Sequence, residues 1–407
     1  MAYDTPAAPD LIAKYEDALT RRTEHKSATL LDRYPRVVGK LIYAVPASRV
    51  DCAQAIGMLA RCLTFPTDDM MAAAERVAAY LGQHADDGIT YGSGAPDLEL
   101  HAYSDSDWQV EHSTSGFVIM YGGAAVTYSS KRQQSIALSS TEAEIMAASS
   151  AAAEIVYIRG LMREMGVVLD APTVLYVDNQ GAVALSKDLK SCQRSRHVER
   201  RFLKVCEFVA LGEIVVKYVN TKEKPADLLT KPLDAATFRK HADHMMGRKN
   251  LLAARCSQAH AGKIRQRTFD VEAAYLKGKF ESSEVLYARP PPAPGTMSRT
   301  FVRGVPVVWR LKVPLYGEAD AGRIWNRTLT KQLVDVQKFV QSAWDPCYFR
   351  KVFSNGSRMD LAMYVDDGFA VDTDTPRADE ELATLNASFK IDVKPAMFFL
   401  GNNVIVH

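Results

Sequence analysis

Acidic side chains stand at the ends of predicted strands and helices in the first part of the sequence. They are Asp105 after a strand, Glu144 on the first turn of a long helix, Asp178 at the close of a strand and Asp227 at the opening of the last helix. Four carboxylates that converge at one edge of a sheet repel one another unless cations hold them. Two Mg²⁺ ions about 4 Å apart, bridged by these oxygens, would activate water and stabilise the leaving oxygen in phosphodiester hydrolysis. The pattern therefore predicts a two-metal hydrolytic centre.

An ordinary structural role stays open for each of these carboxylates taken singly, because acidic side chains favour loops and the first turn of a helix. Glu144 illustrates the alternative, since it completes a capping box with Thr141. Ser139 and Glu142 offer a competing capping box, which would leave Glu144 free for chemistry. The combination of the four residues with the order of the elements favours the hydrolytic interpretation.

A second group of carboxylates lies in the last third of the sequence. Asp270 stands in FDVEAAYLKG, and Asp366 and Asp367 stand in MYVDDGF. Adjacent aspartates in a tight hairpin turn, completed by a third aspartate from a neighbouring strand, can form a two-Mg²⁺ site for nucleotide transfer. Aspartate pairs are also common in ordinary turns, so the pair alone does not decide between the two interpretations.

Alternating strands and helices must position the first group. Predicted strands cover 98–104, 116–123, 124–131, 173–178 and 213–220, and the longer predicted helices cover 141–165 and 195–212. A hairpin is expected around Gly122 and Gly123, and a short helix is expected after Asp178. This order predicts an α/β domain with a mixed sheet over residues 97–246.

The remaining segments have other patterns. Residues 1–35 are predicted to be weakly ordered, apart from a short helical candidate at residues 11–19. Residues 36–96 show the three- and four-residue apolar spacing of packed helices broken at Pro66. Residues 247–262 look like a junction, and residues 263–407 form a second domain of strands and helices.

Composition limits the classes of partner and compartment. The net charge of +2 does not mark the whole chain as a nucleic-acid binder, but a basic cluster between Lys187 and Lys204 suits either phosphates or a solvated helix face. The six cysteines form no C-x-x-C pair, which argues against a zinc cluster or a disulfide framework. No uninterrupted apolar stretch approaches the roughly 20 residues that span a bilayer. We therefore expect a cytosolic or nuclear protein with no membrane partner.

Four segments resemble the catalytic segments of the ribonuclease H domain in copia-type LTR retrotransposons. They are AYSDSDW, ALSSTEAEIMA, LYVDNQGAVALS and PADLLTK, in the family's order. The resemblance implies that the metal-binding carboxylates are Asp105, Glu144, Asp178 and Asp227, and that Asp107 and Glu142 are not among them. It also implies two Mg²⁺ ions per site, with Mn²⁺ as the alternative ion.

The flanking segments extend this resemblance. SRHVERRFLKV is similar to a basic helix of the family and implies nucleic-acid contacts at Arg196, His197, Arg200 and Arg201, although Glu199 stands where an Asp is usual. Residues 36–96 resemble the thumb and connecting segment that holds the hybrid duplex.

The last domain resembles the palm of copia-type reverse transcriptases. DVEAAYLKGKFESSEVLYARPPP, WRLKVPLYGEADAGRIWNRTL, DPCYFRK, MYVDDGFAVDTD and FFLGNNV occur in the family's order. The resemblance makes Asp270, Asp366 and Asp367 the polymerase carboxylates and Tyr275 the aromatic gate against the ribose 2′-hydroxyl. An aromatic core residue is the alternative role for Tyr275.

Two departures from the family affect the expected activity. The family's fingers region, which precedes the first aspartate motif, is absent between the two domains, and the LYGLKQAP segment reads LYGEADAG. The palm also follows the nuclease, in inverted order, which fits either a fusion of two element fragments or a permuted chain whose palm docks on the thumb.

Taken together, these features predict a Pol fragment with a ribonuclease H-like α/β domain, a helical thumb-like segment and a partial α+β palm. The expected activity is Mg²⁺-dependent hydrolysis of the RNA strand of RNA:DNA hybrids, with RNA-directed DNA synthesis weak or absent. The expected partners are RNA:DNA hybrid, RNA template and DNA. The alternative is a catalytically silent remnant that only binds nucleic acid.

Overall fold

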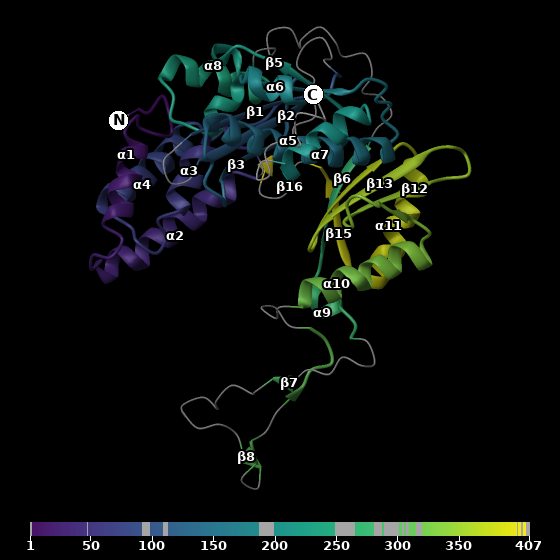
Figure 1. The fold of residues 1–407 in the computed structure, drawn as a ribbon. Helices are drawn as coiled ribbons and strands as arrows, with labels where there is room; N and C mark the ends of the chain where they lie inside the picture. The colour runs from purple at the N-terminus through teal and green to yellow at the C-terminus, as the bar shows by residue number, and fades with distance from the viewer. Residues whose placement is uncertain are drawn as a thin grey trace. The chain divides into compact units, whose positions relative to one another are not determined.

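The structure is a computed structural model of the 407-residue chain, which divides into two compact units, residues 1–259 and 260–407 (Figure 1). The described residues are 2–46, 48–91, 98–108, 113–186, 199–248, 265–280, 287–288, 301–302, 305–306, 309–314, 320–396, 398–399 and 402–403. Each unit has a sheet of its own, and the two are described separately.

A mixed five-stranded sheet organises the first unit. Its strands are β1 (His101–Asp107), β2 (Thr114–Tyr121), β3 (Ala124–Arg132), β4 (Thr173–Val177) and β5 (Ile214–Tyr218), in the order β3-β2-β1-β4-β5. Strands β1 to β3 pair antiparallel, while β4 pairs parallel with both β1 and β5. Gly122 and Gly123 both have positive φ, so the predicted glycine hairpin joins β2 to β3. The mixed sheet confirms the predicted fold class.

Helices of the α/β segment cover one face of this sheet. They are α5 (Ser140–Glu164), α6 (Gln180–Ser186) and α7 (Glu199–Ala210). The apolar face of α5 points inward, with Ile145, Ile155 and Met162 buried in a core that also holds Leu175 of β4. By length and composition α5 could cross a membrane, a test that buried core helices also pass, and 56% of its apolar window is buried.

A helical layer covers the opposite face. It consists of α1 (Leu11–Thr20), α2 (Ala28–Ala44), the 3₁₀ turn η1 (Val50–Cys52), α3 (Ala53–Ala60), α4 (Asp68–Gln83), the 3₁₀ turns η3 (Thr221–Glu223) and η4 (Pro225–Leu229), and α8 (Ala235–Met245). Successive residues of β2 alternate between the two cores: Val118 and Met120 face the helical layer, and Phe117 and Ile119 face α5. The sheet therefore separates two apolar cores.

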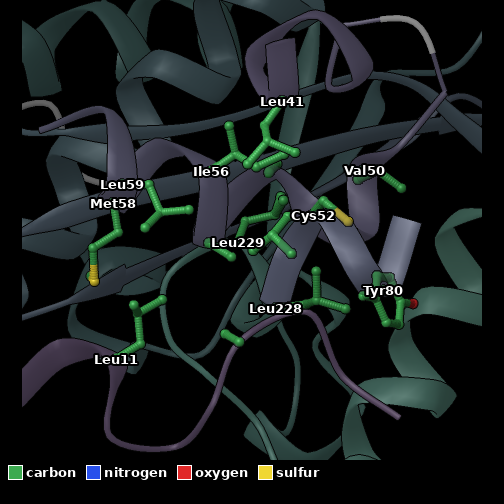
Figure 2. Packing of buried hydrophobic residues seen from close by; sticks show 14 of the residues in the cluster. Leu11, Leu41, Val50, Cys52, Ile56, Met58, Leu59, Tyr80, Leu228 and Leu229 are labelled. Carbon is green, nitrogen blue, oxygen red and sulfur yellow. The ribbon is translucent and has the colours of Figure 1, made fainter. Parts of the chain in front are cut away.

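The core of the helical layer includes part of the α/β segment. Figure 2 shows Leu11 of α1, Ile56 and Leu59 of α3 and Tyr80 of α4 around Leu228 and Leu229 of η4. The 3₁₀ turn η4 lies between the helices and the sheet, so both contribute to one packed body.

Two expectations about the N-terminal region need correction. The boundary predicted after residue 35 lies inside helix α2, which continues through Pro35. Residues 1–35, predicted to be weakly ordered apart from a short helical candidate at residues 11–19, include helix α1, whose Leu11, Tyr15 and Ala18 are buried. Their spacing of four and three residues places them on one face. The helical candidate is therefore present, and the region around it is more ordered than expected.

The second unit contains a six-stranded antiparallel sheet. Its strands are β6 (Arg265–Val271), β11 (Val340–Gln341), β12 (Tyr348–Val352), β13 (Arg358–Tyr364), β14 (Asp367–Asp372) and β15 (Ile391–Pro395), in the order β11-β12-β13-β14-β6-β15. The helices are α9 (Ala274–Lys277), α10 (Ala321–Thr330), which continues as a π-helical segment Lys331–Val336, and α11 (Thr375–Phe389). Short strands are β7 (Tyr287–Ala288), β8 (Phe301–Val302), β9 (Val305–Pro306), β10 (Trp309–Arg310), β16 (Phe398–Phe399) and β17 (Asn402–Asn403).

The core of the second unit joins its helices to the sheet. Trp325 of α10 and Phe389 of α11 are in edge-to-face contact, with ring centroids 5.1 Å apart, and both pack with Phe269 of β6. This α+β arrangement matches the predicted class of the last domain. The proline-rich stretch Pro290–Pro294, whose sequence predicts a rigid, turn-rich insert, lies outside the described residues.

Candidate active sites

Asp105 lies inside strand β1, two residues before its end, and not after the strand as predicted. The strand continues because residues 105–107 pair with residues 114–116 of β2, a contact that the polar sequence does not reveal. The cross-strand neighbour of Asp105 is Gly116. The carboxylate of Asp105 is therefore fixed by a ladder of backbone hydrogen bonds and is almost fully buried, at 3% exposure.

Glu144 and Asp178 reach the same point from two other elements. Helix α5 uses the competing capping box: the Ser139 hydroxyl accepts from the Glu142 N–H at 3.1 Å, which leaves Glu144 free to turn inward. Glu144 Oε1 accepts from the Ser106 N–H at 3.2 Å. Asp178 follows directly after β4. Candidate ligand atoms of Asp105, Glu144 and Asp178 all lie within 4.8 Å of one another.

The sequence predicts that Asp227 opens the last helix, but it does not. It lies in the 3₁₀ turn η4, while Asp234 caps α8 by accepting from the Ala236 and Thr237 N–H groups. Pro225 suits the first position of η4, where no N–H partner is needed. Asp227 is 5% exposed, and Lys231 contacts its Oδ2 at 2.8 Å.

The close packing of η4 on the sheet depends on Gly116. A Cβ atom at that position would lie 2.8 Å from Leu229 Cβ and 2.9 Å from Thr230 Cγ2, distances that real Cβ atoms do not show. The absence of a side chain therefore lets η4 rest directly on β2 beside Asp105. The Thr230 hydroxyl donates to Asp105 Oδ2 as a result.

Lys224, which the sequence analysis did not select, lies among these carboxylates. Its side chain is 0% exposed, and its ammonium group contacts Asp105 Oδ1, Asp178 Oδ2 at 2.7 Å and Asp227 Oδ1 at 3.4 Å. A lysine in a polar turn is normally solvated, so the only sequence signal was its position three residues before Asp227. The candidate centre thus holds a cationic side chain of the protein itself.

Burial and mutual repulsion perturb the protonation of this cluster. Burial, followed by the charge of Asp105, raises the pKa of Glu144 to about 8, although Lys224 opposes the shift. Burial and Asp105 also raise the pKa of Asp227. Burial alone would lower the pKa of Lys224, but Asp105 and Glu144 outweigh it and raise that pKa above its ordinary value. The ammonium group is therefore charged at neutral pH.

The second carboxylate group lies on two neighbouring strands. Asp270 of β6 is the direct cross-strand partner of Asp367 of β14, and Asp366 lies in the tight turn between β13 and β14. A side chain of helix α10 anchors the turn, because Trp325 Nε1 donates to the Val365 carbonyl at 2.6 Å. The Val271 N–H donates to the Asp366 carbonyl at 2.9 Å. The predicted strand, turn and strand are present.

A glycine also shapes this second group. A Cβ atom on Gly368, which follows the aspartate pair, would lie 2.2 Å from the ring of its cross-strand neighbour Phe269. The Phe269 ring therefore covers the space that a side chain at residue 368 would fill. Asp392 of β15, on the other side of Asp270, is a further carboxylate that the sequence analysis missed.

The second group is more open than the first. Asp270 is exposed, and Asp366 and Asp367 are half-buried. Partial burial and the charge of Asp366 raise the pKa of both Asp270 and Asp367. Among the described residues, only Asp105, Glu144 and Asp178 form a group of three whose candidate ligand atoms all lie within 4.8 Å. The polymerase carboxylates are adjacent but do not converge as closely.

The other predicted site residues are placed only in part. Tyr275 lies in α9, half-buried against the core of the second unit, and a Cβ atom on Gly322 of α10 would lie 3.9 Å from its hydroxyl. Arg196 and His197 lie outside the described residues. Arg200 and Arg201 lie in helix α7, but their side chains are not among those described.

Comparison with known proteins relates the chain to reverse transcriptases and to retrotransposon Pol polyproteins. Residues 250–407 match the family "Reverse transcriptase (RNA-dependent DNA polymerase)", a match that begins inside the predicted junction. The retrovirus-related Pol polyprotein from transposon RE2 of Arabidopsis thaliana is 35% identical over 223 residues, which cover 53% of this chain and 15% of that polyprotein. The chain belongs to the Pol polyproteins of copia-type retrotransposons.

Two further matches of this copia-type Pol chain cover nearly whole proteins. Secreted RxLR effector protein 161 of Plasmopara viticola is 36% identical over 129 residues, which cover 31% of this chain and 90% of that protein. The crystal structure of LC11-RNase H1 in complex with an RNA/DNA hybrid aligns with 32% of this chain and 94% of that chain, at 15% identity. Its TM-score of 0.27 is too low to establish a common fold. The strand order of the first unit is the better guide to its class.

Proposed function

We propose that this Pol chain hydrolyses the RNA strand of RNA:DNA hybrids at the carboxylate cluster of its first unit. The observation that carries the proposal is the convergence of Asp105, Glu144 and Asp178 from three separate elements to within 4.8 Å. Repelling carboxylates are buried together only where a cation compensates them. The relationship to Pol polyproteins supports a nucleic acid as the substrate.

The donor set fits a hard divalent cation. All candidate ligands are carboxylate oxygens, which suit Mg²⁺ or Mn²⁺. Two of these oxygens, Glu144 Oε2 and Asp227 Oδ1, are buried and accept no hydrogen bond. Asp105, Glu144, Asp178 and Asp227 would hold the ions, which would supply an activated water and stabilise the leaving oxygen.

The protein residues around the centre fix the geometry of the ligands. The Ser106 N–H orients Glu144, and the hydroxyl of Thr230 orients Asp105. Both contacts come from regular or tightly packed elements, which hold ligands more rigidly than loops do. We propose that the hybrid duplex binds through Arg196, His197, Arg200 and Arg201, where phosphate contacts would make binding dependent on salt.

Hydrolysis of a labelled RNA:DNA hybrid tests the proposal. Wild-type protein with Mg²⁺ is expected to cut the RNA strand, EDTA is expected to stop it, and Asp178→Asn is expected to lower the rate more than about 100-fold, because a metal ligand is lost. Asp170→Asn, an exposed position away from the cluster, is the matched control and should retain full activity. Undiminished cleavage by Asp178→Asn would refute the proposal.

A catalytically silent, nucleic-acid-binding fragment is the second candidate. It is favoured by Lys224, whose ammonium group lies where a cation ligated by Asp105 and Asp178 would lie. This candidate predicts salt-dependent binding of hybrid duplex without cleavage at any Mg²⁺ or Mn²⁺ concentration. Replacing Arg200 and Arg201 by Ala should then lower the slope of log K against log salt by up to about 2.

For the second unit we propose RNA-directed DNA synthesis that is weak or absent. Asp270, Asp366 and Asp367 supply the carboxylates, and Tyr275 follows Asp270 closely in the sequence. Phosphoryl transfer also needs groups that align and neutralise the triphosphate. The family's fingers, which carry these groups, are absent between the two units. Robust primer extension at micromolar nucleotide, lost in Asp366→Asn, would contradict this proposal.

A further inference from the structure

Lys224 differs from an ordinary surface lysine in both its burial and its partners. Its side chain is 0% exposed and its ammonium group contacts carboxylates of Asp105, Asp178 and Asp227. By contrast, Lys231, the neighbouring cation, is 40% exposed and its ion pair is with Asp227. A fully buried ammonium group requires several charged partners to offset its loss of hydration. The carboxylate cluster supplies them.

The backbone fixes the direction of this side chain. Lys224 lies between the 3₁₀ turns η3 and η4, with φ −93° and ψ 103°, the extended conformation favoured for a residue that precedes proline. Its N–H donates to the Thr221 carbonyl at 3.3 Å. The long side chain therefore enters the centre from a short, constrained connection between two turns.

The charges of the cluster are only partly balanced by this one ammonium group. Lys224 contacts three of the four carboxylates, and Lys231 pairs with Asp227. The buried Glu144 Oε2 accepts no hydrogen bond, and Asp227 Oδ1 accepts none beyond its 3.4 Å contact with the Lys224 ammonium group. A divalent ion would require those same oxygens at about 2.1 Å. An ammonium group and a divalent ion cannot share that space, because like charges a few ångströms apart in a buried site repel strongly.

We propose that Lys224 is an internal counter-ion of this centre, which occupies the cation position in the metal-free protein and must be displaced before a divalent ion binds. This inference rests on the proposed function, since it assumes that the carboxylates are the metal ligands. Its consequence is a centre that stays assembled without metal and binds metal weakly. Lys224 is thus a positioning residue that competes with the ion.

Titration of the full chain with Mn²⁺ alone, without nucleic acid, tests this. Calorimetry or electron paramagnetic resonance should give Mn²⁺ binding at least about tenfold tighter for Lys224→Gln and Lys224→Met than for wild type, since the competing charge is gone. Lys224→Arg, which keeps the charge, should bind as weakly as wild type. Lys231→Gln is the matched control and should change the affinity less than about twofold, because that side chain is half-exposed. Equal or weaker Mn²⁺ binding by the folded Lys224 variants would overturn the inference.

Thermal unfolding supplies a second measurement that needs no activity. EDTA should leave the melting temperature of the wild type unchanged, while Lys224→Gln should melt lower in EDTA and recover in Mn²⁺. A Lys224→Gln variant that folds only with Mn²⁺ would also support the inference, because the metal ion then supplies the positive charge that the lysine supplied. A Lys224→Gln protein with the same melting temperature in EDTA and in Mn²⁺ would also overturn the inference.

The two proposals can fail separately. Tighter Mn²⁺ binding by Lys224→Gln, with no hybrid cleavage by any variant, would leave the counter-ion inference standing and remove the proposed nuclease activity. Hybrid cleavage by the wild type, with identical Mn²⁺ affinity in Lys224→Gln, would do the reverse.

Discussion

The two carboxylate groups of this chain are assembled in different ways. The polymerase aspartates lie on adjacent antiparallel strands and their turn, so local pairing alone brings Asp270 beside Asp367. The nuclease carboxylates come from a strand, a helix, a strand end and a 3₁₀ turn, and only the packing of the whole unit brings them together. The polymerase group is the more open to solvent, and the nuclease group is buried around a lysine.

This difference has an energetic consequence. Exposed carboxylates are screened by water and tolerate one another, whereas buried carboxylates require a compensating charge at all times. The nuclease centre has such a charge in Lys224, while the polymerase group relies on solvent. The comparison therefore predicts that removing a neighbouring cation destabilises the nuclease unit and leaves the stability of the polymerase unit unchanged.

The largest expected effect is on the stability of the metal-free nuclease unit. Lys224→Ala should lower its free energy of unfolding by about 3–5 kcal/mol in EDTA, because it leaves buried carboxylates uncompensated. Urea denaturation at pH 8 measures this. In the second unit, Lys394→Ala removes an exposed partner of Asp392 and should leave the urea midpoint unchanged. If Lys224→Ala and Lys394→Ala changed the stability of their units equally, the proposed difference between the two carboxylate groups would be wrong.

A smaller effect is expected from filling the space at Gly116. Gly116→Ala should destabilise the first unit by about 1–3 kcal/mol, because the new methyl group overlaps Leu229 and Thr230 and pushes η4 away from Asp105. Hybrid cleavage should fall further than stability alone explains, since η4 carries Asp227. Gly57→Ala is a suitable control, because its nearest new contact would be an ordinary 3.5 Å. A fully active Gly116→Ala protein would show that η4 need not touch the sheet.

The corresponding change in the second unit is Gly368→Ala. The added methyl group meets the ring of Phe269, a side chain that can rotate at some cost, so we expect destabilisation of about 1–2 kcal/mol. Phe269→Leu in the same chain should recover part of this loss by making room. Additive losses in the double variant would contradict the proposed steric cause.

The smallest effect concerns an ion pair away from both centres, which provides a reference. Arg163 and Arg159 lower the pKa of Glu213, and Arg159 is 3% exposed. A carboxyl group with a lowered folded-state pKa adds stability above its unfolded-state pKa and loses it as the pH falls through the folded-state value. Glu213→Gln should therefore reduce stability by roughly 1 kcal/mol at pH 7. This difference should shrink as the pH falls below the ordinary glutamate range and vanish once the pH lies below the lowered pKa of Glu213. A loss that persists in acid strong enough to protonate Glu213 fully would point to packing instead of charge.

Sequence patterns identified most elements but not all of their limits. The long apolar stripe of α5 and the glycine hairpin were predictable because their periodicity and turn residues are local. The end of β1 was not, since Asp105 and Asp107 are polar residues held in a strand only by pairing with β2. The helix that Asp227 was expected to open begins later, because Asp234 caps it.

The candidate site was predictable in its ligands and not in its surroundings. Acidic motifs mark Asp105, Glu144 and Asp178, whose functional roles stay predictions. Lys224 was not predictable, because its burial depends on two turns that fold over the sheet. The role of Gly116 was not predictable either, because it depends on contacts with a segment more than a hundred residues later in the chain.

The shared core beneath η4 has a practical consequence for dividing this chain. Leu228 and Leu229 pack against Leu11, Ile56 and Leu59 of the N-terminal helices (Figure 2). A chain that starts at residue 97 would keep every candidate nuclease ligand and still expose this apolar surface to water. We expect such a fragment to aggregate, because the helical layer is what covers the apolar side of the turn that carries Asp227.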